Sequence, residues 1–199
     1  MEEQNVTRIR LRLIDLIKSF FISRPDAELL SRWRGTFSAL AKEQISPVMD
    51  RSVRRLNEQL ATKKLEDIQD EFYALFVDPF SDHRLNLYAS HYFDGRNYGE
   101  TLISVRQIFT DNNIKKQSDV TDPEDSLPIL VDLLGTLIEL ENEQSGSDLQ
   151  TLVQTLLIPF VEKLKRQAEV NEIAGFYRAA IDFVSAYLDL ERGLTGADR

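Results

Sequence analysis

The feature that most constrains the fold is the spacing of the apolar residues, which recur every three or four positions along almost the whole chain. This is the period of an amphipathic helix, whereas a half-buried strand would alternate apolar and polar residues, and no stretch does so convincingly. The pattern therefore predicts an all-α fold, a helical bundle of about eight or more helices. Among the residues expected on buried helix faces are Ile9, Leu16, Trp33, Val48 and Tyr177.

Capping residues and prolines predict where several helices begin. Ser23 to Asp26 and Ser46-Pro47 each combine a cap residue with a proline, which is typical of a helix start, and a further helix is expected from about Lys64. Pro128 inside a helix would cost a hydrogen bond. We therefore expect Asp122 to Asp125 to form a capping turn and the regular helix to start near Asp125 or Ser126.

Other residues predict helix ends. Asn112-Asn113 should end a short helix, because asparagine tolerates the left-handed cap conformation. Gln144 to Ser147 predicts a break, followed by a helix that starts at Ser147 and is kinked or interrupted at Pro159. The last helix is expected over residues 171–192, ending at Gly193.

A chain of 199 residues is most economically one domain. At this size a single core buries roughly 70% of the surface that the unfolded chain exposes. We therefore expect residues 1–199 to form one helical domain, with residues 71–128 as the central segment around which the other helices are arranged.

The central segment is rich in aromatic residues. Nine of the 17 Phe and Tyr residues of the chain fall between Glu71 and Ser126, and the stretch LYASHYFDG, residues 87–95, reads as an irregular loop. Loops that connect helices are normally polar and lie on the surface. A loop with this many rings is therefore expected either to fold back onto the core or to form a binding wall.

Charge is distributed unevenly along a chain whose net charge is −9. Residues 1–64 hold 13 Lys and Arg against 8 Asp and Glu, whereas residues 117–162 hold 10 Asp and Glu and no base. Nucleic-acid binding depends on Lys and Arg neutralising phosphates, so no nucleic-acid partner is expected. The acidic segment either attracts a basic peptide or simply solvates helix faces.

The compartment follows from what the sequence lacks. Without cysteine there can be no disulfide, thiolate metal site, iron–sulfur cluster or cysteine nucleophile. The first ten residues carry acids where a secretory leader has bases, and no run of 18 apolar residues occurs. We expect a cytoplasmic protein with no stable membrane insertion.

Patterns typical of enzymes are missing. His83 and His91 lie near Asp82 and Asp94, but their spacing matches no compact metal-ligand pattern. The stretch GRNYGET, residues 95–101, lacks both the glycine spacing and the lysine of a phosphate loop. The sequence therefore predicts no catalytic residue, no metal site and no cofactor.

Three ordered motifs carry a resemblance to a known family. The first motif is EFYALF at a helix end, with Phe72, Leu75 and Phe76. The second is LYASHY, with Tyr88, Ser90 and Tyr92, and the third is DPEDSL, with Pro123, Glu124 and Asp125. Gly99-Glu100 lies between the second and the third. In this order, within a helical chain of about this length, they resemble the TorD/DmsD/NarJ family of redox-enzyme maturation chaperones.

The resemblance implies a function. Members of that family are cytoplasmic all-helical chaperones that hold the catalytic subunit of a molybdopterin oxidoreductase until its cofactor is inserted, commonly by binding its twin-arginine leader peptide. It implies a peptide-binding site at Phe72, Leu75, Phe76, Tyr88, Ser90, Tyr92, Pro123, Glu124, Asp125 and Ser126. Such bundles can exchange helices between subunits, which makes a homodimer a further partner to test.

The sequence departs from the family pattern at three positions. Leu87 replaces the loop proline, Ala74 stands where an arginine is common, and Ser126 occupies the position of a motif histidine tied to leader recognition. A serine there is smaller, uncharged and does not titrate near neutral pH. These changes bear on the client more than on the fold.

A leader with a basic pair and an apolar segment needs an apolar groove beside carboxylates. Leu75, Phe76, Tyr88 and Tyr92 could form the groove, with Glu124 and Asp125 beside it. Burying ~400 Å² of apolar surface is worth roughly 10 kcal/mol before ordering costs, whereas exposed charge pairs add ~0.2–1 kcal/mol each. We therefore expect the groove to set affinity and the acids to set selectivity.

Two other functions and a structural role for each motif remain open. Phe72 and Leu75 fit a core stripe, Tyr88 to Tyr92 could stitch the loop to the bundle, and Asp122 to Asp125 could merely cap a helix. The first alternative function is a helical protein–protein adaptor that has lost leader binding, and the second is a metal- or nucleotide-dependent enzyme.

Overall fold

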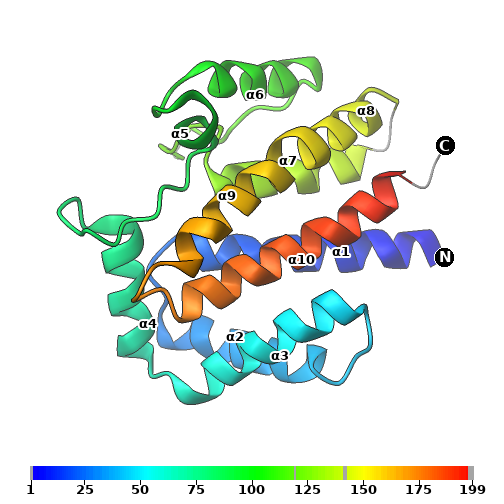
Figure 1. The fold of residues 1–199 in the computed structure, drawn as a ribbon. Coiled ribbons are helices and arrows are strands. Elements are labelled where there is room, and N and C mark those ends of the chain that lie inside the picture. Colours follow the sequence, from blue (N-terminus) through cyan, green and yellow to red (C-terminus); the bar gives the residue numbers. More distant parts are fainter. Residues whose placement is uncertain (1, 119, 141–142, 197–199) are drawn as a thin grey trace. The chain divides into compact units, whose positions relative to one another are not determined.

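The chain folds into helices, as the apolar spacing predicts. The structure is a computed structural model that describes residues 2–118, 120–140 and 143–196, drawn in Figure 1. The α-helices are α1 (Glu2–Phe21), α2 (Ala27–Leu40), α3 (Pro47–Thr62), α4 (Leu65–Phe72), α5 (Ala89–Asp94), α6 (Glu100–Asp111), α7 (Leu127–Leu140), α8 (Glu143–Thr151), α9 (Ile158–Glu169) and α10 (Phe176–Gly196), and two π-helices are η1 (Tyr73–Val77) and η2 (Leu152–Leu157).

The all-α prediction is confirmed. Over the described residues the extended pairing is limited to an isolated bridge that joins Tyr88 and Ser126. None of the helices in this part of the chain is both long enough and apolar enough to cross a membrane.

The contacts divide the chain into two compact units. Unit 1 comprises residues 1–21, 87–160 and 191–199, and unit 2 comprises residues 22–86 and 161–190. The expectation of a single domain over residues 1–199 stays a prediction.

Unit 1 is built on α7, in which ten of 14 residues are buried. A helix that is apolar on nearly all sides must be covered from several directions, and α1, α8 and η2 pack against it. Gly135 lets α1 approach closely, because a Cβ at this position would lie 3.3 Å from Cγ2 of Ile14. A bidentate ion pair between Arg10 of α1 and buried Glu191 also belongs to this unit.

Unit 2 is held together by stacked and edge-packed rings. The α2 and α3 helices pack together, and the Trp33 ring of α2 stacks on the Phe176 ring at 5.5 Å. Phe37, one turn further along α2, meets Phe183 edge to face at 5.0 Å. Such pairs add to the free energy gained from burying the rings.

Most expected helix starts are found within a few residues. Ser46 caps α3 by accepting a hydrogen bond from the Met49 N–H, with Pro47 in the first turn, as predicted. At the start of α2 the cap is Asp26, not Ser23, because the Asp26 carboxylate accepts from the Leu29 N–H at 2.7 Å. The α7 helix starts at Leu127, so Pro128 lies in the first turn, where its missing N–H costs nothing.

Several expectations are corrected. Residues 144–147 do not break a helix but lie inside α8, so Ser147 does not start one. The last helix starts at Phe176 and runs past Gly193. Part of the expected loop at residues 87–95 is helical, as α5. Ile9 and Val48 are exposed by 49% and 44% and do not belong to the core.

The two π-helices are unpredicted features. At the end of η1 the Asp78 N–H donates to the Tyr73 carbonyl, and at the end of η2 the Ile158 N–H donates to the Val153 carbonyl. The wider turn of η2 comes directly before Pro159 and accommodates the predicted interruption there.

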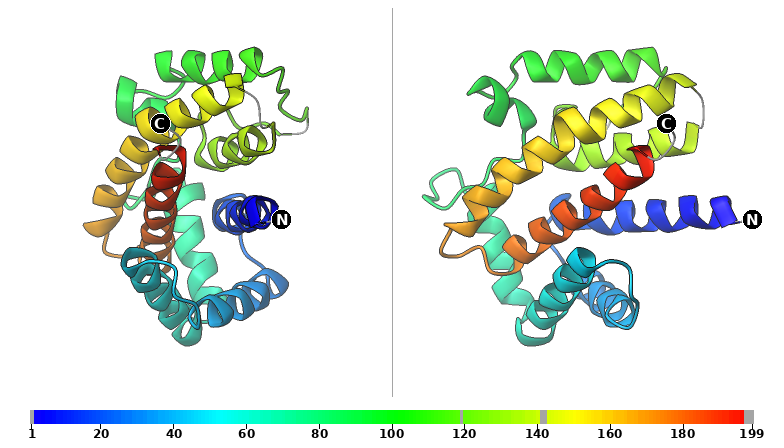
Figure 2. Two further views of the ribbon diagram at one scale, coloured as in Figure 1. Left: turned by 90° about the vertical axis from the view of Figure 1, so that its right-hand side faces the viewer. Right: turned by 45° about the vertical axis from the view of Figure 1, so that its right-hand side comes forward.

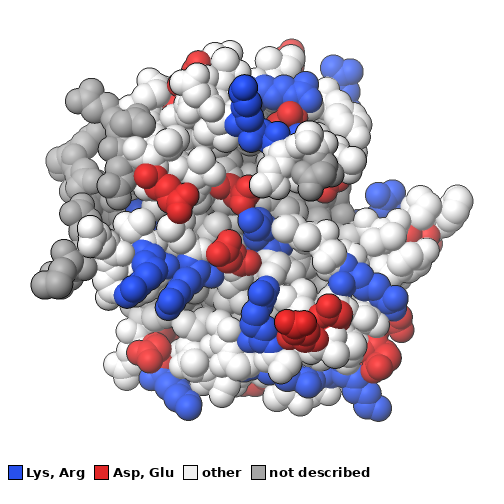
Figure 3. All heavy atoms as spheres, turned by 180° about the vertical axis from the view of Figure 1, so that it is seen from behind, with Lys and Arg blue, Asp and Glu red and all other residues white. Residues whose placement is uncertain are grey.

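The uneven charge along the sequence does not become a surface of one sign on the face drawn in Figure 3. Lys and Arg side chains alternate there with Asp and Glu side chains. The two interpretations of the acidic segment therefore both stay predictions.

Candidate functional site

The second and third motifs meet in unit 1. Tyr88 and Ser126 form the isolated bridge. Backbone hydrogen bonds flank it, from the Leu127 N–H to the Leu87 carbonyl (2.8 Å) and from the Ala89 N–H to the Asp125 carbonyl (3.0 Å). The segments LYASHY and DPEDSL, more than 30 residues apart in the sequence, are therefore side by side.

Asp125 supports the start of α5 rather than presenting a charge to solvent. Its Oδ2 accepts a hydrogen bond from the Ser90 N–H at 2.9 Å, and the residue is fully buried. Its Oδ1 and the Oγ of buried Ser126 have no hydrogen-bond partner among the described residues. The Asp125 carboxylate and the Ser126 hydroxyl are therefore not accessible at the surface.

The turn between α5 and α6 is fixed by two further side chains. Ser90 Oγ accepts from the N–H of Tyr98, which has a φ of 62°. Asp94 Oδ2 accepts from the Thr101 N–H at 2.9 Å and thereby caps the start of α6. Gly99 is required by this cap, because a Cβ there would lie 2.2 Å from Asp94 Oδ2.

Of the two acids of the third motif that the predicted site includes, Glu124 reaches solvent and Asp125 does not. Its carboxylate pairs with Arg106 at 3.0 Å and with Lys116 at 4.0 Å, and its side chain is 16% exposed. Burial alone would raise the pKa of Glu124. Hydrogen bonds from its own backbone N–H and from Arg106, together with the charges of Lys116 and Arg106, outweigh burial and leave the pKa below the ordinary value.

The tyrosines of the second motif are half-buried against other rings of unit 1. The Tyr88 ring lies 6.3 Å from that of Tyr98, and the Tyr92 ring lies 5.3 Å from that of Phe160. Each therefore exposes an edge while its body is packed, a combination common at contact surfaces.

The first motif lies in unit 2. Phe72 and Leu75 are buried, whereas Phe76 is half-buried with its ring 5.4 Å from that of Phe72 and 5.0 Å from that of Tyr177. The glutamate that opens the motif is buried as well: Glu71 accepts hydrogen bonds from Lys63 Nζ and from the N–H groups of Phe176 and Tyr177.

The predicted site residues fall into two classes by exposure. Those that reach solvent are Phe76, Tyr88, Tyr92 and Glu124, and those that are buried are Phe72, Leu75, Ser90, Pro123, Asp125 and Ser126. In this conformation the buried set can position a site but cannot touch a peptide. The assignment of all ten to peptide binding stays a prediction.

His83 and His91 each make a local contact, His83 through its backbone and His91 through its ring. The His83 carbonyl accepts from Asn171 Nδ2 at 2.7 Å, and the His91 ring lies edge-on to that of Tyr92. Across the part of the chain that the structure describes, no three His, Asp or Glu side chains are grouped so that they could hold a metal ion.

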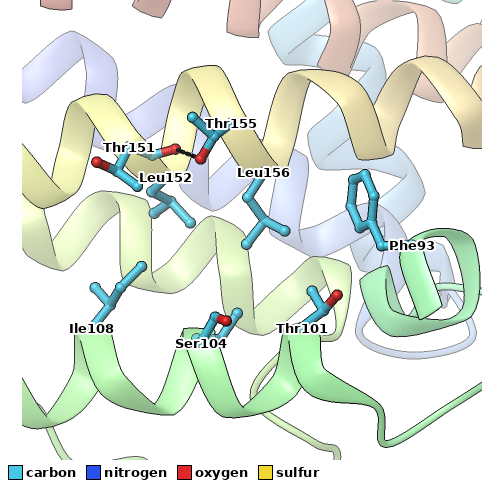
Figure 4. A pocket seen from close by; sticks show the side chains of 9 residues that line it. Phe93, Thr101, Ser104, Ile108, Thr151, Leu152, Thr155 and Leu156 are labelled. Carbon is cyan, nitrogen blue, oxygen red and sulfur yellow. Dashed lines mark hydrogen bonds between the residues drawn. The ribbon is translucent and has the colours of Figure 1, made fainter.

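A groove in unit 1 was missed at the level of the sequence. It has a volume of about 240 Å³ and is lined by Phe93, Thr101, Ser104, Val105, Ile108, Thr151, Leu152, Thr155 and Leu156 (Figure 4). The α6 residues among these follow the spacing i, i+3, i+4, i+7. That helical spacing was a usable signal, but the hydroxylated residues in the stripe concealed it.

Known proteins resemble the chain over most of its length. The model of the nitrate reductase delta subunit family matches residues 42–167. Chaperone protein TorD of Aliivibrio fischeri (strain ATCC 700601 / ES114) is 31% identical over 160 residues, which cover 73% of this chain and 74% of TorD. TorD of Aliivibrio salmonicida (strain LFI1238) is 29% identical over 153 residues, covering 70% and 69%.

The fold also resembles a solved one. A crystal structure from Archaeoglobus fulgidus, assigned to a redox enzyme maturation protein, superposes with a TM-score of 0.53 at 16% identity and covers 93% of this chain and 92% of that chain. At this identity the likeness concerns the fold alone. The family match and the TorD relatives carry the assignment: the chain belongs to the TorD/DmsD/NarJ family of redox-enzyme maturation chaperones, which are not enzymes.

Proposed function

We propose that this chaperone acts in the cytoplasm on the apo catalytic subunit of a molybdopterin-dependent oxidoreductase. It binds the twin-arginine leader, or the N-terminus that replaces it, and holds the subunit for cofactor insertion before export or assembly. Family membership and the similarity to TorD chaperones support this proposal. The observation that carries it is the bridge between Tyr88 and Ser126, which brings the segments of the second and third motifs side by side.

The chemistry of that surface suits such a ligand. Tyr88 and Tyr92 offer half-buried rings, and Glu124 offers a carboxylate that stays ionised because its pKa is lowered. Arg106 and Lys116 already pair with Glu124. An arginine of the leader therefore has to share or displace these partners, so the acid contributes selectivity more than affinity.

The test is a pull-down of the tagged chaperone from its own host grown anaerobically, with co-purifying proteins identified by mass spectrometry. We expect a cofactor-free molybdoenzyme catalytic subunit with its N-terminal segment intact. The matched control is a strain whose subunit lacks that segment, in which recovery should fall. Light scattering of the purified chaperone and of the complex determines whether a homodimer forms.

Recovery of unrelated proteins, with no such subunit although it is expressed, would contradict the proposal. The helical adaptor would then be the better description, and its partner would be expected to leave at moderate salt.

A further inference from the structure

The groove missed at the level of the sequence lies between α6 on one side and α8 with η2 on the other. Figures 1 and 2 show these elements next to each other in unit 1, α6 in green and α8 with η2 in yellow. Figure 4 shows Leu152 and Leu156 pointing toward the helix that carries Thr101, Ser104 and Ile108, with Phe93 of α5 at one end. From Thr101 to Ile108 the groove runs for roughly two helical turns, about 10 Å.

The lining is mainly apolar, and two of its four residues with hydroxyl groups bond within their own helices. Ser104 Oγ donates to the Glu100 carbonyl of its own helix at 3.3 Å, and Thr155 Oγ1 donates to the Thr151 carbonyl at 2.7 Å. Because these hydroxyls are satisfied within their helices, they make no demand on a ligand. The floor is formed by Val105 and Leu152, which are buried.

The dimensions favour the side chains of a peptide over a small molecule. Pockets for small molecules and cofactors are typically ~300–1,000 Å³ and offer a few convergent polar groups. This groove is smaller, at about 240 Å³. An amphipathic helix that binds through two turns of its apolar face needs a short apolar groove, and this groove has that length.

The charges around the groove favour a basic peptide. The helices that form it carry Asp94, Glu100, Asp111 and Asp148 outside the lining itself, and Glu100 forms no ion pair among the described residues. The α8 and η2 wall has no base. Of the bases nearby, Arg106 and Lys116 are paired with Glu124 at 3.0 Å and 4.0 Å, which leaves Arg96 before α6 and Lys115 after it. The helices that form the groove therefore carry more acids than bases.

We infer that this groove binds the apolar segment of the basic leader, as a helix of about two turns. The inference rests on the proposed function and gives it a location that none of the three motifs indicates. Phe93 links the groove to the second motif, because it belongs to α5, which contains part of that motif, and also lines the groove.

The test blocks the groove without disturbing the core. Ser104 lines the groove and is exposed, so Ser104→Trp should fill the groove. The matched control is Ile103→Trp, because Ile103 lies on the same helix, is 67% exposed and does not line the groove. The probe is a fluorescein-labelled peptide with an arginine pair followed by a leucine-rich segment. We expect Ser104→Trp to raise the Kd at least about tenfold and Ile103→Trp to change it less than about twofold.

A second measurement does not depend on the tryptophan variant folding. The chain has no cysteine, so Ser104→Cys and Ile103→Cys each carry a single environment-sensitive dye. The peptide should shift the emission of the dye at position 104 to the blue and leave that at position 103 unchanged.

The outcomes separate the two proposals. If the client subunit is recovered from the host but the peptide binds Ser104→Trp as it binds the wild type, or shifts neither dye, the groove is not the leader site while the proposed function stands. If neither the client nor the peptide is bound by the wild type, both are wrong.

Discussion

Glu71 shows at the scale of one residue how the first motif serves the fold. Its buried carboxylate accepts from the N–H groups of Phe176 (3.1 Å) and Tyr177 (2.7 Å), the first two residues of α10, and from Lys63 Nζ (2.9 Å). These N–H groups have no partner within the helix and must be satisfied from outside. Burial, and then the charge of Glu71, raise the pKa of Tyr177 well above its ordinary value.

Removing this cap should destabilise the protein. Glu71→Ala leaves two helix N–H groups and Lys63 without their acceptor, so we expect the free energy of unfolding to fall by about 2–4 kcal/mol. Urea denaturation followed by circular dichroism measures it. Exposed Glu66, in the first turn of α4, gives the control Glu66→Ala, which should cost less than about 0.5 kcal/mol. Equal midpoints for the two variants would show that α10 does not depend on Glu71.

Phe76 and Asp125 should differ in how they affect the leader. Phe76 is half-buried with an exposed part, whereas Asp125 is fully buried and hydrogen-bonded to Ser90. Phe76→Ala should therefore weaken peptide binding more than Asp125→Asn, whose main effect should be on stability. A peptide titration at a temperature where both variants are folded compares them, with Phe80→Ala, at a ring that is 91% exposed, as the control. If Asp125→Asn weakened peptide binding more than Phe76→Ala, apolar contacts would not be the main source of affinity.

Glu124 predicts a pH dependence of stability. Its folded-state pKa lies below the ordinary value of 4.5, so its contribution is fully present above that value and is lost as the pH falls through the lowered pKa. Between about pH 5 and pH 3 the wild type should lose more stability than Glu124→Gln. Exposed Glu139, changed to Gln, is the control, and its curve should follow that of the wild type. Parallel curves for the wild type and Glu124→Gln would contradict the role given to Arg106 and Lys116.

At the scale of the elements, the start of α6 depends on a close approach. A Cβ on Gly99 would lie 2.2 Å from Asp94 Oδ2, the atom that caps Thr101. Gly99→Ala should displace that carboxylate and lower the free energy of unfolding by about 0.5–2 kcal/mol. The exposed helical Gly146, where a Cβ meets nothing within 4 Å, is the control, because Gly146→Ala should be neutral or stabilising. A Gly99→Ala variant as stable as the wild type would mean that the cap is dispensable.

The helices themselves could be predicted because their signals are local. Apolar spacing and the cap at Ser46 need no information from other parts of the chain. The start of α10 at Phe176 could not be predicted, because its cap comes from Glu71, 105 residues earlier. The continuous α8 was missed since Gly146 and Ser147 are weak helix formers, whereas nearby Ser145 is 1% exposed and held by packing.

The candidate site was predictable in its residues but not in its geometry. The motifs identified Tyr88, Ser90, Asp125 and Ser126, and the structure brings these together. Burial of Asp125 and Ser126 is a property of the tertiary fold that the order of motifs does not contain. The sequence does not indicate the groove, because Thr and Ser count as polar there, although the hydroxyls of Ser104 and Thr155 bond within their own helices.

At the scale of the molecule, the decisive question is whether net charge or apolar area governs partner binding. The chain carries a net charge of −9, and a basic partner is attracted to it at long range. Yet acids and bases are interspersed on the face of Figure 3, and Glu124 is already paired. Charge should therefore affect the rate of approach and the choice of partner more than the stability of the complex.

The salt dependence of binding tests this balance. Each exposed charge pair is worth about 0.2–1 kcal/mol, so two arginines of a leader contribute at most about 2 kcal/mol, or roughly thirtyfold in Kd. Raising the salt from about 50 mM to 500 mM screens those pairs and should weaken the arginine-containing peptide by no more than about tenfold. A peptide with glutamines in place of the arginines should bind less tightly at low salt and converge with it at high salt. An adaptor held by its acidic segment would instead release a basic partner almost completely over the same range, because no apolar contact would remain when the charges are screened.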